Sequence, residues 1–255
     1  MKIKTFLQRF IILFVWFFVN YYAYCFFIIP CLKTNKNKLF GEIFLIYWSL
    51  LSFIWLLSYF YVSWFDPGSV ECEKRKLMKK NIYDLEKQLS YIRRCEKCGI
   101  EKPNRAHHCS KCGKCYIRFD HHCPTVGNCI AYLNIQPFAL YLSYGALILF
   151  SLSFISGISF VFSSPISTSI ASSLSVLYFL LGICLSMFAW NTVSSLINDN
   201  TTLEKIYRSK MGLKVQDENY EVFWGKSKLK WFIPHQPEIN GLIWSKSVIN
   251  NNYTP

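Results

Sequence analysis

Charged residues are scarce in this sequence and unevenly placed. Asp, Glu, Lys and Arg make up 17% of the 255 residues, whereas they make up roughly 25% of an average protein. Three long runs contain none of them: 10–32, 43–65 and 121–198. Charge-free runs of this length are typical of segments that cross a lipid bilayer. The composition excludes a collagen, a coiled coil, a disordered tail and a disulfide-rich secreted miniprotein.

Four segments are long and apolar enough to span a bilayer, which takes roughly 20 residues of helix. They are residues 10–29, 43–65, 138–162 and 170–197. The first segment is longer than the apolar core of a cleavable signal peptide and has no small-residue cleavage site, so we expect it to be a span. The third and fourth are rich in Ser and Gly, which permits close helix approach, and their short connection makes them antiparallel neighbours.

The predicted spans also lack ionisable side chains, and the amide of Asn20 is the nearest approach to one. Ion-coupled transporters and proton pumps usually place such groups in the middle of the membrane. This absence argues against transport. We therefore expect the chemistry of the protein to lie in its non-membrane segments.

Lys and Arg are concentrated on one side of the predicted spans. Of the 28 in the chain, 25 fall in residues 1–9, 66–137 and 198–255. The positive-inside rule then predicts that the N-terminus, this long loop and the C-terminal tail are cytosolic. The net charge of +13 follows from this topology and from attraction to anionic membrane lipid, so we expect no nucleic acid partner.

Cysteine and histidine gather in one part of the long loop. Seven of the eleven Cys and four of the five His lie between Cys95 and Cys129. Because the cytosol is reducing, metal binding is expected there rather than disulfides. The candidate ligands are Cys95, Cys98, His107, His108, Cys109, Cys112, Cys115, His121, His122, Cys123 and Cys129. Repeated gaps of two residues are typical of tetrahedral zinc sites; two such sites would use eight ligands and leave three, which the spacing does not identify.

The segment from Asp120 to Cys123 suggests a reactive thiol. If it is extended, His121 and Cys123 share one face and His122 points to the other. An imidazole beside a thiol raises the thiolate fraction and produces a nucleophile, while His122 is free to bind metal. Asp120 would have to curl back to orient His121, which alternation alone does not provide.

This pattern, continued by Asn134 and Phe138, resembles the cysteine-rich domain of the DHHC family of protein S-acyltransferases (palmitoyltransferases). Further family marks occur in the expected order: Asp66-Pro67-Gly68, Pro103-x-Arg105-Ala106, Thr201-Thr202-Leu203-Glu204, and Asn219 six residues before Gly225. The resemblance extends from about 59 to 234, with the cysteine-rich domain at 91–138.

The resemblance implies a role for each residue of the cluster. Cys123 corresponds to the nucleophile, His121 to its general base and Asp120 to the group that orients the base. One structural Zn²⁺ would be held by Cys95, Cys98, His108 and Cys115, and a second by Cys109, Cys112, His122 and Cys129. Thr202 is expected near Asp120. The sequence departs from the family at Thr125, Gly127 and Ala131, where Trp, Asn and Gly are usual.

Together these observations predict an all-α integral membrane protein with four transmembrane helices and a cytosolic, cysteine-rich double-zinc domain between the second and third. The resemblance implies a protein-cysteine S-palmitoyltransferase of the endomembrane system, in the endoplasmic reticulum, Golgi or plasma membrane. Its acyl donor would be palmitoyl-CoA or another long-chain acyl-CoA, with the chain lying among the spans. The acyl group would pass through Cys123 to membrane-proximal cysteines of cytosol-facing substrate proteins. The sequence identifies neither an accessory subunit nor the residues that contact CoA.

Three other functions are compatible with parts of the pattern. A membrane-anchored scaffold of RING type needs a closing Cys-x2-Cys pair, whereas this cluster closes with Cys123-x5-Cys129. A catalytically inactive family member could act as a scaffold. A transporter is disfavoured by the uncharged spans. The tail from Val222 to Ile233 mixes aromatic residues with Lys and is expected to lie against the bilayer surface.

Overall fold

The computed structural model describes residues 2–79, 93–103, 105–161, 165–198, 201–202 and 220–242. It is mostly helical, with four helices long and apolar enough to cross a membrane and a cysteine-rich region between the second and third of them. The predicted fold class is thereby confirmed, with six short strands added to the helices. Leu203, Glu204 and Asn219 lie outside the described residues. The chain forms two compact units: residues 1–59 with 139–191, and residues 60–138 with 192–255.

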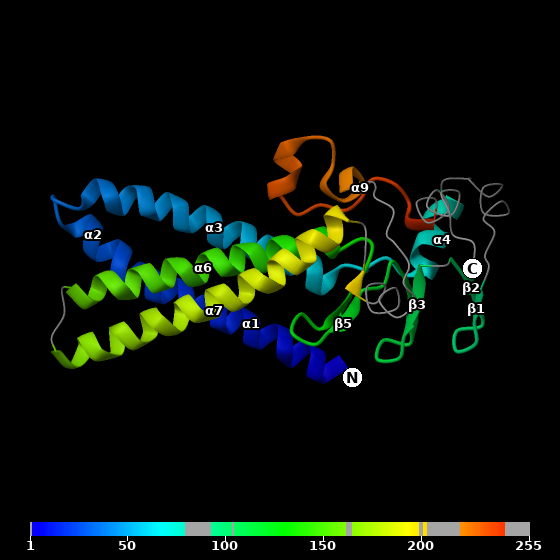
Figure 1. Ribbon diagram of the computed structural model, residues 1–255, viewed down its shortest axis with the longest axis horizontal. Helices are drawn as coiled ribbons and strands as arrows, with labels where there is room; N and C mark the ends of the chain where they lie inside the picture. Colours follow the sequence, from blue (N-terminus) through cyan, green and yellow to red (C-terminus); the bar gives the residue numbers. More distant parts are fainter. Residues whose placement is uncertain are drawn as a thin grey trace. The chain divides into compact units, whose positions relative to one another are not determined.

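The apolar helices are found side by side in the first unit (Figure 1). Their elements are α1 (Lys2–Ala23), η1 (Tyr24–Ile28), α2 (Ile29–Lys33), α3 (Lys38–Trp64), α6 (Ile135–Val161) and α7 (Pro165–Ile197). The stretches apolar enough to span a membrane are Phe6–Lys33, Lys38–Trp64, Ile135–Ile158 and Ser169–Ile197.

The first span changes to π-helical geometry at η1, just before Pro30. Pro30 has no N–H to donate to the carbonyl of Phe26, and its ring crowds that carbonyl. A π turn absorbs this conflict without ending the helix, because it moves the hydrogen bonds by one residue.

An apolar core lies where α1, η1, α3 and α6 meet in the first unit. Its buried residues are Ala23, Phe27, Ile28, Phe44, Trp48, Leu51, Ile148, Leu152 and Ile155. Away from this core, large apolar side chains such as Phe14, Met187 and Trp190 remain mostly exposed. Apolar surface on this scale is stable in lipid but not in water.

A polar network joins α1 to α3 inside this apolar unit. The Asn20 side-chain oxygen accepts hydrogen bonds from Trp48 Nε1 (3.0 Å) and Ser52 Oγ (2.8 Å). The Asn20 amide nitrogen donates to the carbonyl of Trp16 (2.8 Å), and Trp16 Nε1 donates to Ser52 Oγ (2.9 Å). Three of the four side-chain hydrogen-bonding positions of Asn20 are therefore used where lipid offers no alternative partner.

Small residues let α6 and α7 pack closely. A Cβ at Gly182 would lie 2.8 Å from the ring of Phe150, so only glycine fits without a shift. Ser153 and Ser175 each donate a hydroxyl hydrogen bond to the other's carbonyl, at 2.8 and 2.9 Å. Close backbones and such bonds replace the hydrophobic effect that is missing between helices in lipid.

The second unit contains the last residues of α3 and α7, the first residues of α6, and the elements that carry the cysteine cluster. These elements are α4 (Val70–Lys79), β1 (Arg93–Cys95), β2 (Ile100–Lys102), β3 (Ala106–Cys109), β4 (Lys114–Ile117), β5 (His121–Cys123), β6 (Asn128–Ile130), α9 (Tyr220–Trp224) and η2 (Lys228–Phe232). The strands form three separate antiparallel hairpins, β1-β2, β3-β4 and β5-β6.

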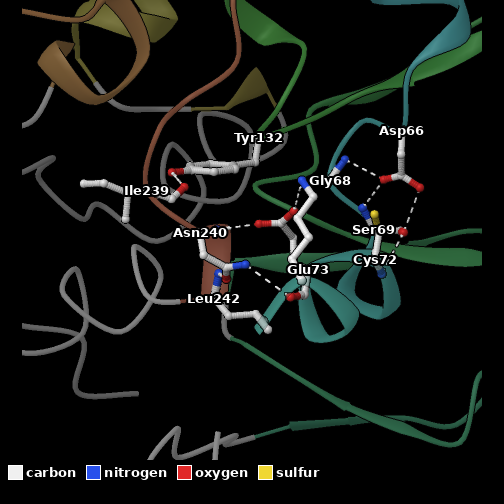
Figure 2. Close-up of polar contacts among 11 residues, drawn as sticks. Asp66, Gly68, Ser69, Cys72, Glu73, Tyr132, Ile239, Asn240 and Leu242 are labelled. Carbon is white, nitrogen blue, oxygen red and sulfur yellow. Dashed lines mark hydrogen bonds and ion pairs between the residues drawn. The ribbon is translucent and has the colours of Figure 1, made fainter. Parts of the chain in front are cut away.

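The Asp66-Pro67-Gly68 motif starts α4 after the second span ends. Asp66 accepts hydrogen bonds from the backbone N–H of Gly68 (2.8 Å) and Ser69 (2.6 Å) and from Ser69 Oγ (2.9 Å). Ser69 Oγ in turn accepts from the N–H of Cys72 and caps the helix (Figure 2). The caps satisfy N–H groups that the first helical turn leaves without partners.

A short C-terminal segment attaches to α4 through the buried Glu73 (Figure 2). One carboxylate oxygen of Glu73 accepts from the N–H of Gly241 (2.8 Å) and the other pairs with Lys76 (2.7 Å). Asn240 donates to the Glu73 carbonyl (3.1 Å), and Tyr132 Oη donates to the carbonyl of Ile239 (3.0 Å). These contacts join residues 239–241 to α4 and to Tyr132, which follows β6.

Candidate active site and metal centre

The three hairpins share one turn geometry. The cysteine that begins each turn pairs with the residue five positions later: Cys95 with Ile100, Cys109 with Lys114, and Cys123 with Asn128. Each turn ends in a glycine with positive φ: Gly99 and Gly113 at 67°, and Gly127 at 63°. This left-handed conformation is strained for most residues, so the turns favour Gly at that position.

The first cluster joins the first hairpin to the second. The turn of β1-β2 contributes Cys95 and Cys98, and the cross-strand pair of β3-β4 contributes His108 and Cys115. The Cys98 sulfur lies 3.1 Å from His108 Nδ1 and 3.8 Å from the Cys115 sulfur. All four ligand atoms lie within 4.8 Å of one another.

The second cluster joins the second hairpin to the third in the same way. Its members are Cys109 and Cys112 from the turn of β3-β4, and the cross-strand pair His122 and Cys129 of β5-β6. His122 Nδ1 lies 3.7, 3.4 and 3.6 Å from the sulfurs of Cys109, Cys112 and Cys129. The sulfurs of Cys112 and Cys129 are 3.4 Å apart.

Both clusters fit a zinc ion. Bond lengths of about 2.3 Å to sulfur and about 2.0 Å to nitrogen place tetrahedral ligands roughly 3.5–3.8 Å apart. Neighbouring ligand atoms in the two clusters lie between 3.1 and 4.0 Å apart, and no two atoms of a cluster are more than 4.8 Å apart. Three thiols and one imidazole per site match the soft, borderline character of Zn²⁺. With four protein ligands each, the sites are closed.

Cys123 belongs to neither cluster, although it begins the third turn. The residue is 7% exposed. Its sulfur is hydrogen-bonded by His121 and by the backbone N–H groups of Thr125 and Val126. The alternation expected for an extended segment is present in β5, because His121 contacts Cys123 while His122 reaches the second cluster.

Asp120 does curl back onto its neighbour. Its Oδ2 lies 2.7 Å from His121 Nδ1. Its position is set by Thr202, which donates its backbone N–H to Oδ1 (2.6 Å) and its hydroxyl to Oδ2 (3.1 Å). The ring of Phe138, in the first turn of α6, packs edge-on against the His121 ring at 5.6 Å. The imidazole is thus held between a carboxylate and a thiol.

These contacts shift all three ionisation equilibria. Burial alone would lower the pKa of His121, but hydrogen bonds with Asp120 and Cys123 outweigh it and raise the pKa to about 9. Burial raises the pKa of Cys123, but the His121 hydrogen bond and the N–H groups of Val126 and Thr125 bring it below its ordinary value. Burial likewise opposes ionisation of Asp120, yet its bonds to His121 and Thr202 leave its pKa lowered. The arrangement favours a thiolate beside an imidazolium.

Two asparagines attach the third hairpin to the end of the second apolar helix. Asn128 donates to the carbonyls of Val62 (2.9 Å) and Phe65 (3.0 Å). The buried Asn134 donates to the carbonyls of Cys129 (2.8 Å) and Val62 (3.5 Å), and it accepts the N–H of Ala131. Carbonyls that the last turn of a helix leaves without partners are satisfied in this way. The thiol of Cys123 therefore lies in a hairpin anchored to the end of an apolar helix.

Arg118 makes a comparable attachment to α7. Its guanidinium is fully buried and donates to the carbonyl of Ser195 in the last turn of α7 (3.0 Å). It also lies 4.6 Å from the centre of the Phe223 ring, a cation–π contact. A cation near a helix C-terminus complements the helix dipole. Sequence analysis did not single out Arg118 or Asn128, because nothing local marks a charged or amide side chain as buried.

One of the three departures from the family pattern has a simple physical reading. Gly127 occupies a left-handed position, and Asn is the other residue that adopts this conformation most readily. Gly therefore preserves the turn where the family commonly has Asn. Thr125 is exposed, so the Trp that is usual at this position would add an exposed ring. Ala131 is buried.

The comparison with known protein families identifies the domain. Residues 89–209 match the family described as DHHC palmitoyltransferase. This segment is a DHHC domain. The match contains both clusters, Cys123 and Thr202, and the predicted resemblance is confirmed. A search among curated proteins gives no match to the chain. A DHHC domain implies palmitoyltransferase activity in general.

Sequence analysis also missed a short repeat inside the DHHC domain. The turn cysteines Cys95, Cys109 and Cys123 are spaced by exact intervals of 14 residues, as are Gly99, Gly113 and Gly127. A count of candidate ligands does not show this 14-residue spacing, because it ignores the order of the cysteines in the chain. Aligning the chain with itself at that interval reveals three copies of the same hairpin.

Proposed function

We propose that this protein transfers a long-chain acyl group from acyl-CoA to cysteine thiols of cytosol-facing proteins, with Cys123 as the covalent carrier. The observation that carries the proposal is the isolation of one thiol. Six cysteines and two histidines of the DHHC domain gather in two closed metal sites, and Cys123 stays outside them beside His121.

The first half of the reaction acylates Cys123. Its thiolate attacks the carbonyl carbon of the acyl-CoA thioester, a new carbon–sulfur bond forms, and the bond to the CoA sulfur breaks. The departing CoA thiolate takes the proton of the His121 imidazolium. Asp120, held by Thr202, keeps the imidazole oriented through Nδ1. This half yields acyl-Cys123, free CoA and neutral His121.

The second half transfers the acyl group to a protein substrate. Neutral His121 accepts the proton of the incoming cysteine thiol, and the resulting thiolate attacks the acyl-Cys123 carbonyl. The carbon–sulfur bond to Cys123 breaks, and the thiolate returns to its starting pair with the His121 imidazolium. Because the same unit holds the ends of α3 and α7 and the start of α6, substrates with cysteines near the membrane are favoured.

The two clusters would hold structural zinc: Cys95, Cys98, His108 and Cys115 at one site, and Cys109, Cys112, His122 and Cys129 at the other. When bound, zinc supplies rigidity to hairpins whose strands are only three or four residues long. Each site takes two ligands from one hairpin and two from the next. Removal of zinc is expected to separate the hairpins and thereby to displace Cys123 from His121.

The test is covalent labelling of the purified full-length protein with a long-chain acyl-CoA that carries a click-reactive tail. We expect a hydroxylamine-sensitive adduct on Cys123, located by peptide mass spectrometry. Cys123→Ser should lose the adduct and the transfer activity while retaining two zinc ions per chain. Cys72→Ser is the matched control, because Cys72 is cytosolic on our topology but lies outside both clusters.

Each outcome separates this proposal from a scaffold function. An adduct that persists in Cys123→Ser would overturn the role of Cys123. A protein that binds two zinc ions yet forms no adduct with acyl-CoA of any chain length would instead be an inactive family member. Loss of zinc from Cys123→Ser would show that the thiol is a ligand and would also overturn the mechanism.

A further inference from the structure

The 14-residue repeat differs between its copies at one informative position. Two copies read Cys-x2-Cys-Gly, at Cys95 to Gly99 and at Cys109 to Gly113. The third copy reads Cys-x2-Val-Gly, at Cys123 to Gly127. Val126 therefore stands where the other two turns place their second metal-binding thiol.

The backbone of the third turn is built like the others. Its strand register and the positive φ of Gly127 match those of the first two hairpins. In the first turn, the backbone N–H groups two and three residues beyond Cys95 bond to its sulfur. In the third turn, those two and three residues beyond Cys123 do the same. Cys123 thus has the geometry of the first thiolate of a zinc turn.

The third hairpin is followed directly by α6 and not by another hairpin. In the first two sites, the other two ligands are a histidine and a cysteine at equivalent positions of the next hairpin, His108 with Cys115 and His122 with Cys129. The positions 14 residues beyond His122 and Cys129 are Gln136 and Ser143. Both lie in α6, which begins at Ile135.

His121 nevertheless places a second potential metal ligand beside the sulfur of Cys123. Its Nδ1 bonds to Asp120, so its other nitrogen faces the thiol. A histidine held by a carboxylate in this way is the usual arrangement of a zinc ligand. Catalytic zinc sites need only three protein ligands. The turn is therefore one ligand short of a zinc site, and the missing ligand is at position 126.

We infer that Val126 keeps Cys123 free of metal, and that this apolar residue converts a zinc-binding turn into a nucleophile-bearing turn. The inference rests on the proposed function only in calling Cys123 a nucleophile. Val126 is fully buried, so its side chain both fills the position of the second thiol and offers no donor atom. A positioning residue of this kind acts by excluding zinc from the thiolate that the turn stabilises.

The decisive variant is Val126→Cys in the full-length protein. The introduced thiol, Cys123 and His121 would form a three-ligand site, so we expect three zinc ions per chain instead of two. After replacement of zinc by Co²⁺, the thiolate-to-metal absorption should rise by about a third, because the thiolates increase from six to eight. Alkylation of Cys123 by a maleimide should become at least tenfold slower in zinc and recover when free zinc is buffered to low concentration.

Two controls isolate the position of the thiol. Val126→Ser introduces a side chain of nearly the same shape as cysteine, but its hydroxyl is a poor zinc ligand. This variant should retain two zinc ions, and alkylation of its Cys123 should not depend on zinc. Thr125→Cys adds an exposed thiol one residue out of register and should also retain two. The double variant Cys123→Ser with Val126→Cys should return from three zinc ions to two. If Val126→Cys does not accumulate as folded protein, Val126→Asp supplies a carboxylate ligand for the same count.

Zinc counting does not depend on acyl transfer, so the inference and the proposed function fail separately. Two zinc ions in Val126→Cys, with alkylation of Cys123 unaffected by zinc, would overturn the inference even if Cys123 is acylated normally. Three zinc ions in Val126→Ser or Thr125→Cys would also overturn it. A third zinc confined to Val126→Cys supports the inference whether or not the wild-type protein carries an acyl group.

Discussion

His121 and His122 are adjacent in the chain but face different chemistry. The extended geometry of β5 directs His121 to Cys123 and Asp120, and it directs His122 to the sulfurs of Cys109, Cys112 and Cys129. A strand places successive side chains on opposite faces. Under the proposed mechanism, two adjacent histidines therefore serve different roles, His121 in proton transfer and His122 in a metal site.

Alanine substitutions should separate these two roles. His121→Ala is expected to retain two zinc ions per chain and to slow acylation of Cys123 by about 10²–10⁴-fold, the usual contribution of a general acid–base. His122→Ala should lower the zinc content toward one per chain, because it removes one of four ligands. Elemental analysis alongside single-turnover labelling with acyl-CoA measures both. The opposite pattern of zinc loss would contradict the assignment.

In the proposed mechanism, Asp120 and Thr202 act on the reaction through His121. Asp120→Asn removes the negative charge that holds the imidazole and its proton, so we expect acylation to slow by about 10²-fold or more. Thr202→Val keeps the backbone bond to Asp120 but loses the hydroxyl bond, worth about 1 kcal/mol or roughly fivefold in rate. Both should leave the zinc content and the KM for acyl-CoA unchanged. A raised KM with an unchanged rate constant would instead indicate a substrate-binding role.

At the scale of elements, metal sites join neighbouring hairpins, and hydrogen bonds attach the hairpins to the ends of helices. Each strand has only three or four residues, and an isolated two-stranded hairpin is marginally stable at best in water. Metal sites connect one hairpin to the next, while Asn128 and Arg118 connect the domain to the ends of α3 and α7. These polar contacts and metal sites position Cys123 together with the buried apolar residues of the same hairpins.

In the first unit, the Asn20 network is expected to stabilise the packing of α1 against α3. Asn20→Leu removes the acceptor for Trp48 and Ser52 and leaves two donors without partners in an apolar setting. We expect a loss of about 1–2 kcal/mol, typical of hydrogen bonds between membrane helices. Phe17→Leu, at an exposed position on the same helix, is the control and should have little effect. Thermal unfolding in detergent measures both; equal midpoints for the two variants would contradict the prediction.

At the scale of the whole molecule, charge distribution predicts the topology. The segments around the DHHC domain and both termini carry most of the Lys and Arg, which places them in the cytosol by the positive-inside rule. The short connection between α2 and α3 carries few and is expected on the opposite side. A DHHC domain on the cytosolic face would meet acyl-CoA and reduced substrate thiols.

Introduced cysteines can test this orientation in sealed vesicles whose cytosolic face is outward. Asn35 and Ser227 are exposed, one in the α2–α3 connection and the other in the C-terminal tail. Ser227→Cys should react with an impermeant maleimide at once, whereas Asn35→Cys should react only after detergent is added. Peptide mapping identifies the labelled cysteine. Immediate labelling of both positions would overturn the predicted topology.

The membrane spans and the metal chemistry could be predicted because both depend on local composition. Long uncharged runs indicate membrane spans, and a high density of Cys and His in a reducing compartment indicates a metal site. The family resemblance added the division of the eight ligands into two sets. The prediction of an all-α fold missed the six strands, because strands of three or four residues are too short to produce an alternating pattern.

By itself, the sequence determined that this chain crosses a membrane and carries a cysteine-rich domain of the DHHC type. Only the tertiary structure decided which other side chains from separate segments meet: Asn128 bonds to Val62 across 66 residues, and Arg118 bonds to Ser195 across 77. The 14-residue repeat marks position 126 in the sequence, but only the structure shows that Val126 is buried in a turn with the geometry of the other two. The physical reason is that hydropathy and ligand type are properties of single residues, whereas orientation, burial and metal exclusion arise from contacts between residues distant in the chain.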